Sequence, residues 1–172
     1  MTIAMQPIYT QTVGSGGTGT VIFNNIPQTF TDLYFTLSAR GSASQLSVDC
    51  FCSFSGQIGT THSQTRLIGT GSSVGSDRPT TGSAFRLTDV SAGTSTSNSF
   101  SSATFYLPNY TSTNNRSVMT ESSMGNSATL SYLGFTGVTY LSSAAITSVR
   151  FDSSPGNFVQ HSTFSLYGIT KG

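Results

Sequence analysis

Hydrophobic and polar residues alternate most regularly between positions 32 and 54. Within residues 32–40, and again within residues 46–54, every second side chain is apolar. Such period-two alternation predicts β-strands with one buried and one hydrated face. The connection at residues 41–44 is short and rich in Gly and Ser, so it favours an antiparallel pair. The apolar faces of this pair would begin the core, which we expect to include Phe35, Leu37, Val48, Phe54, Phe105 and Leu107.

Shorter segments with β-forming residues follow one another along the rest of the chain, separated by turns rich in Gly, Asn, Ser and Pro. No stretch of a dozen residues has the apolar spacing of an amphipathic helix. The pattern predicts an all-β fold, an antiparallel β-sandwich of the jelly-roll type. Beyond the central pair, the expected strands are residues 8–13, 20–23, 63–70, 84–87, 99–107, 117–124, 128–135, 144–151 and 163–169.

The chain of 172 residues fits a single domain preceded by a short arm. Residues 1–19 are expected to form this N-terminal arm, which includes a short strand and ends in a Gly-rich hinge at Gly14–Gly19. Pro7 disfavours helix in the residue before it, which is consistent with an extended arm. Residues 20–172 are expected to form the β-sandwich domain.

Charge is scarce in this sequence, and its scarcity excludes several partners. Charged residues make up 8% of the chain, compared with about 25% in a typical protein, whereas Ser and Thr make up about a third. The six Arg and one Lys are scattered, so we expect no nucleic-acid partner and no anionic membrane surface. The sequence has no apolar run of transmembrane length and no signal-peptide pattern, so we expect synthesis in a cytosol. A surface so poor in charge favours self-association, and we expect an oligomer.

One serine motif and two histidines could suggest catalysis. Gly71–Gly75 fits the Gly-x-Ser-x-Gly pattern of hydrolases, but that motif requires a strand before the serine and a helix after it. Pro79 follows too closely for a long helix, so we interpret the match as chance. His62 and His161 have no carboxylate at ligand spacing beside them. We therefore assign neither histidine a metal or a general-base role.

The remaining reactive residues also have simple structural explanations. Cys50 and Cys52 would lie on one face of a strand, where the geometry is poor for a disulfide, and no second Cys pair could complete a zinc site. Asn109 and Asn115 begin glycosylation sequons, which have no use without secretion. The seven Tyr could form a sugar-binding platform, although the chain has no Trp. We assign no catalytic, cofactor-binding or metal-binding residues and expect that the protein is not an enzyme.

Seven short segments follow one another over nearly the whole chain: residues 9–17, 23–33, 38–40, 66–73, 106–110, 114–117 and 156–169. Together they resemble the corresponding segments of a group of small bacteriophage virion proteins and tail-fibre modules. The group has no catalytic motif, and it includes both head and tail proteins. The resemblance therefore implies a virion component.

The first function that this resemblance implies is that of a capsid decoration, or cement, protein. Three copies would bind the outer surface of the head at local threefold positions and bridge neighbouring copies of the major capsid protein. The arm at residues 1–19 would lie along the capsid or on a neighbouring copy, and would become ordered on binding.

Two alternatives belong to other classes. A tail-tip or tail-fibre module would recognise a host-surface glycan or protein through the loops 71–82 and 91–97. A carbohydrate-active enzyme on a jelly roll would need two carboxylates roughly 5–9.5 Å apart. The only candidates for that pair are Asp32, Asp49, Asp77, Asp89, Glu121 and Asp152.

Overall fold

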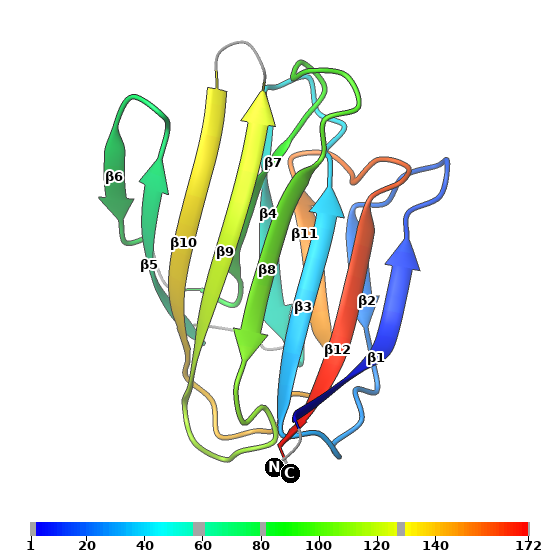
Figure 1. Ribbon diagram of the computed structural model, residues 1–172, viewed down its shortest axis with the longest axis vertical. Coiled ribbons are helices and arrows are strands. Elements are labelled where there is room, and N and C mark those ends of the chain that lie inside the picture. Colours follow the sequence, from blue (N-terminus) through cyan, green and yellow to red (C-terminus); the bar gives the residue numbers. More distant parts are fainter. Residues whose placement is uncertain (1–2, 57–60, 80–81, 127–129, 172) are drawn as a thin grey trace.

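The computed structural model describes residues 3–56, 61–79, 82–126 and 130–171, and these form two antiparallel sheets packed face to face (Figure 1). No helix occurs among the described residues. The prediction of an all-β, antiparallel sandwich is therefore confirmed. The larger sheet contains, in spatial order, β1 (Ile3–Thr12), β12 (Thr163–Lys171), β3 (Asp32–Ala39), β8 (Ser101–Leu107), β9 (Arg116–Asn126), β10 (Leu130–Tyr140), β5 (His62–Gly69) and β6 (Val74–Asp77). The smaller sheet contains β2 (Thr20–Phe23), β11 (Val149–Ser154), β4 (Ser47–Phe54) and β7 (Phe85–Ser91).

The space between the sheets is filled mainly by aromatic side chains. Phe35 and Phe105 stack on neighbouring strands of the larger sheet with ring centroids 4.2 Å apart. Phe151 of the smaller sheet packs edge-on against Phe35 at 6.2 Å. All six residues predicted for the core are buried: Phe35, Leu37, Val48, Phe54, Phe105 and Leu107. Alternation along the strands thus correctly predicted which faces point inward.

The expected pairing of the two central strands is wrong. β3 pairs with β12 and β8 in the larger sheet, whereas β4 pairs with β11 and β7 in the smaller one. The chain between them crosses from one sheet to the other, and there Gly41 approaches Val48 so closely that a Cβ on Gly41 would lie 2.3 Å from a Val48 methyl group. Alternation identifies a buried face but not the neighbouring strand, because both sheets present apolar faces to the same core.

The described part of the predicted arm, residues 3–19, belongs to the sandwich. β1 pairs with β12 along its whole length, and the register shifts at a bulge between Pro7 and Tyr9. Beyond β1, Val13 is buried, and its N–H donates to the carbonyl of Ser162 at 2.8 Å. The Gly-rich segment forms a turn, in which the positive φ of Gly17 (67°) is the conformation that Gly adopts readily. Nine of the ten residues of β1 pair with β12, so in the single chain these residues form an edge strand of the larger sheet.

We expect Leu37→Ala to lower the free energy of unfolding by about 2–5 kcal/mol. Leu37 is only 5% exposed and lies on the inner face of β3, so the change would leave a cavity between the sheets. Urea denaturation followed by tyrosine fluorescence would measure the loss. A loss below about 0.5 kcal/mol would contradict the burial of this side chain, because surface substitutions fall in that range.

Candidate functional site

The serine motif lies in a tight turn at one edge of the larger sheet. The N–H of Thr70 donates to the carbonyl of Ser73 at 2.9 Å, and the two hydroxyl oxygens are also 2.9 Å apart. Strand β6 follows at Val74, where the hydrolase motif would require a helix. This turn therefore does not have the geometry that exposes a nucleophilic serine.

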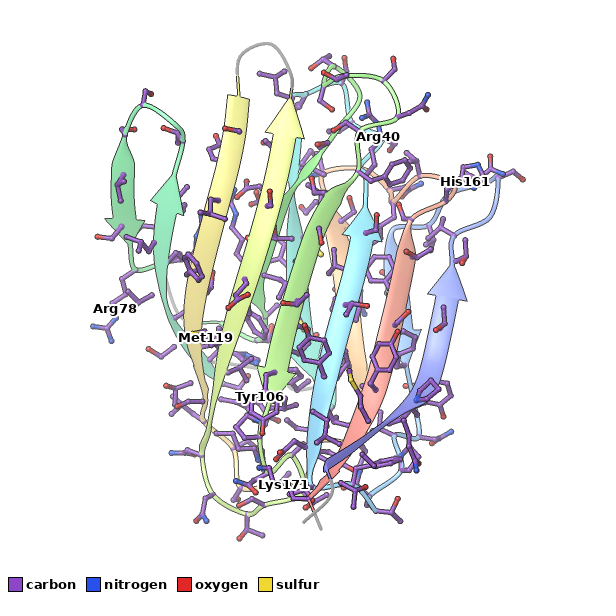
Figure 2. All side chains as sticks on the ribbon, viewed as in Figure 1. Arg40, Arg78, Tyr106, Met119, His161 and Lys171 are labelled. Carbon is purple, nitrogen blue, oxygen red and sulfur yellow. The ribbon has the colours of Figure 1, made fainter. Side chains whose placement is uncertain are left out.

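His62 and His161 lie in very different surroundings. His62 is buried among Phe54, Phe85 and Tyr140, with Nδ1 3.2 Å from the carbonyl oxygen of Gly82. Burial lowers the pKa of the His62 imidazole. His161 is exposed in the turn before β12 (Figure 2). Among the described residues, neither histidine forms an ion pair, and no cluster of side chains is suited to hold a metal ion.

Cys50 and Cys52 are free thiols on the inner face of β4, and both are fully buried. Burial raises the pKa of each thiol well above its ordinary value. A thiol that is both protonated and inaccessible is a poor nucleophile, so these residues act as small apolar core side chains.

Five of the six carboxylates take part in ion pairs. Arg86 contacts both Asp49, at 2.6 Å, and Asp89. Arg66 lies 3.4 Å from Asp77 and extends this chain of alternating charges to the edge of the larger sheet. The other two pairs are Arg150–Asp152 and Lys171–Asp32. Glu121 is the one carboxylate without an ion pair in the part of the chain that the structure describes.

Asp32 links three strands at one end of the larger sheet. Its carboxylate is fully buried and accepts hydrogen bonds from Lys171 Nζ at 2.6 Å, from the Asn109 backbone at 2.8 Å and from the Tyr106 hydroxyl. Burial alone would raise the pKa of the Asp32 carboxyl, but these donors stabilise the charged form and lower its pKa below the ordinary value. The interaction joins β3, β8 and the end of β12.

Arg40 plays a similar part at the other end (Figure 2). Nη1 donates to Ser95 Oγ at 3.0 Å and to the carbonyl of Ser99 at 2.9 Å, and Nη2 donates to the carbonyl of Ala92 at 2.6 Å. The loop 91–97, one of the two expected recognition loops, is therefore held in place from inside. The other expected loop, 71–82, contains strand β6 within its described residues.

The outer faces of the two sheets differ sharply in charge. The smaller sheet carries five charged residues on its outer face: Asp49, Arg86, Asp89, Arg150 and Asp152. On the larger sheet, Glu121 is the one exposed charged residue at an outward position of the described parts of the four central strands β3, β8, β9 and β10, because Asp32 at the end of β3 is buried against Tyr106 and Lys171. This near-neutral face is turned toward the viewer in Figures 1 and 2.

Large apolar side chains stand exposed on this near-neutral face, and we call them the outer apolar patch. Met119 is 60% exposed, Leu133 56% and Phe135 40%. They are neighbours in the sheet, because Met119 pairs with Gly137 and Leu133 lies two residues before Phe135 on β10. The complete patch is Leu67, Val74, Tyr106, Met119, Leu133 and Phe135.

Two shallow depressions lie within the patch. One, of about 240 Å³, is bordered by Thr104, Glu121, Leu133 and Phe135. The other, of about 360 Å³, lies over Gly137, and we call it the Gly137 groove. Its outer walls are formed by Tyr106, Pro108, Ser117, Met119 and Thr139. No charged side chain lines the Gly137 groove.

Sequence reasoning missed this face, although a signal was present. Leu67, Met119, Leu133 and Phe135 occupy positions of their strands whose immediate neighbours point inward. Apolar residues on both faces of a strand are expected where the second face is also covered. Here the second face is uncovered in the single chain, so these residues indicate a contact surface.

Comparison with known proteins adds no family. No model of a known protein family matches the chain, and a search of curated proteins finds no match. None of the described residues belongs to a helix long and apolar enough to span a membrane.

We expect Asp32→Asn to remove part of the acid dependence of stability. Because the pKa of Asp32 is lower in the folded chain, its stabilisation is complete above the ordinary pKa of 3.8 and is lost as the pH falls through the folded value. Urea denaturation between about pH 7 and pH 3 should show the gap between wild type and D32N narrowing toward acid.

Glu121→Gln is the matched control for D32N, because it removes a carboxylate that has no ion pair among the described residues. The pH dependence of E121Q should follow that of the wild type. Parallel curves for D32N and wild type over the whole range would show that Asp32 is not stabilised in its charged form.

Proposed function

We propose that this chain is a structural protein of a bacteriophage virion, namely a capsid decoration (cement) protein. In this role it binds the outer surface of the head as an oligomer and stabilises the head by bridging capsomers. The observation that carries the proposal is the near-neutral, apolar outer face of the sandwich, because exposed apolar patches of this kind mark protein–protein contact sites. The ordered series of virion-like segments along the sequence supports the same proposal.

The charge distribution supports protein contacts in preference to nucleic-acid contacts. Arg66, Arg86 and Arg150 are all paired with aspartates. Arg40 and Arg116 donate instead to backbone carbonyls. Binding to a phosphate backbone needs a cluster of free cations, and these five side chains are already occupied. A decoration protein on the outside of a DNA-filled head has no need of such a cluster.

The partners in this proposal are other copies of the chain, expected as a homotrimer, and the major capsid protein. Packaged DNA pushes the subunits of a head apart. A bridging oligomer resists this because separation would expose the surface that it buries across each seam. A stiff sandwich suits that load, since its strands are cross-linked at both ends by Arg40 and Asp32. No catalytic step is part of this role.

A tail-tip or tail-fibre receptor-binding module is the second candidate, and one observation favours it. A depression of about 310 Å³ lies beside the β8–β9 connection. Its lining of amide and hydroxyl groups is chemically suited to sugar hydroxyls, and it includes Asn109, Ser112, Asn114, Asn115 and Ser117. This role would place the protein at the host surface, bound to a glycan or protein receptor.

Counting and locating the protein on intact particles would decide between the two roles. Gold-labelled antibody and image reconstruction should find hundreds of copies on the head at threefold positions. A few copies at the tail would overturn the decoration role and would make the β8–β9 depression the site to test against host glycans. Particles without the protein would overturn both roles.

A further inference from the structure

We infer that the outer face of the larger sheet is a contact between copies of this chain. In this contact the ridge formed by Leu133 and Phe135 of one copy enters the Gly137 groove of another. The inference goes beyond the proposed function, because it names the surface through which copies meet and holds for a head or a tail protein. It rests on the shape of the face, on its lack of charge, and on features of the sheet edges that hinder strand pairing.

The ridge and the groove are adjacent on one strand. Four outward positions follow one another along β10. Leu133 and Phe135 have large side chains, Gly137 has none, and Thr139 has a small one. Neighbouring outward positions are roughly 7 Å apart along a strand. A Cβ added at Gly137 would have no neighbour closer than the carbonyl oxygen of Thr65, at 4.0 Å. The groove is therefore open space where a side chain would otherwise stand.

The occupant of the groove must be apolar and uncharged, because Tyr106 and Met119 form its walls and no charged side chain lines it. The ridge of a second copy meets this requirement. A different partner that filled the groove alone would leave Leu133 and Phe135 exposed, whereas a second copy covers the ridge and the groove together. Two copies that each place their ridge in the other's groove form a closed contact with twofold symmetry, which is separate from the threefold contact expected of a homotrimer.

Association through the edges of the larger sheet is disfavoured, which favours its outer face as the contact. β1, at one edge, carries Pro7, which has no N–H to donate, and a bulge beside it. β6, at the other edge, has only four residues. Short edge strands, proline and bulges are features that prevent edge-to-edge pairing. Glu121 is the one charge near the ridge, so two such faces meet with little repulsion.

Filling the groove tests this contact directly. Gly137→Val places a β-branched side chain in open space on a strand, so the variant should fold as the wild type does. Sedimentation velocity of the full chain over a range of concentrations should show an oligomer for wild type. For G137V, the protein concentration at which half of the oligomer has dissociated should be at least ~10-fold higher than for wild type, or only monomer should be present.

Gly125→Val is the matched control. Gly125 is an exposed residue on the neighbouring strand β9, a Cβ there would meet nothing within 4 Å, and it does not line the groove. G125V should therefore associate as the wild type does. A wild type that stays monomeric at all concentrations would overturn the inference, as would a G137V protein that associates normally.

A second variant tests the ridge and protects the experiment against misfolding of the first. Leu133→Ser removes an exposed apolar side chain and should weaken association as G137V does. Mixed together, the two variants should associate more strongly than either alone, because the ridge of G137V can enter the intact groove of L133S. A mixture that associates as weakly as either variant alone would contradict the pairing of ridge with groove. If the chain forms the oligomer but is absent from virus particles, the proposed function is wrong, whereas this contact between copies is still supported.

Discussion

The packing of aromatic rings between the sheets is the interaction on which the rest of the structure depends. Phe151, from the smaller sheet, contacts Phe35, Phe105 and Phe164 of the larger one at centroid distances of 5.2–6.2 Å. Each such pair adds about 0.5–1.5 kcal/mol beyond the area it buries. The described chain has no helix to cover a sheet, so each sheet covers the other. The outer faces are then free to differ in chemistry.

The few charged residues stabilise the ends and one side of this core. Arg40 donates to the backbone of the 91–99 segment, and Asp32 accepts from three groups that come from separate segments. Hydrogen bonds that involve a charged group are worth more than neutral ones, and these are partly or wholly shielded from water. The remaining ion pairs lie on the smaller sheet and at the β5–β6 edge of the larger sheet. Because the charges are used in these places, Glu121 is the one exposed charge on the outer face of the described parts of the four central strands.

Local patterns in the sequence predicted the fold class and the inward faces but not the partners of the strands. The alternation at residues 32–40 and 46–54 was sufficient to place Phe35 and Val48 in the core, because side-chain direction is a local property. Strand order depends on long-range packing, and the two segments contribute apolar side chains to the same core from opposite sheets. For this reason the predicted antiparallel pair is wrong although its residues are buried as expected.

The same limit applies to the candidate site and to the N-terminus. The Gly-rich stretch after β1 indicated a hinge, whereas Gly17 allows a turn that returns the chain to Phe158. The outer apolar patch combines residues from β5, β6, β8, β9 and β10, which come together only through the sheet order. A single sequence shows each of these residues as an isolated exception to alternation. Their common face is visible only when the register is known.

An exposed apolar patch on a chain of such low charge would normally promote aggregation, because little electrostatic repulsion keeps copies apart. The structure limits how that association can occur. Edge pairing adds strand to strand without end, and it is hindered here by Pro7 and its bulge on β1 and by the shortness of β6. Contact through a face covers that face and then stops, provided that the symmetry closes. Low surface charge and protected edges together therefore favour an assembly of limited size, in which the uncharged face is buried and the charged face of the smaller sheet stays in water.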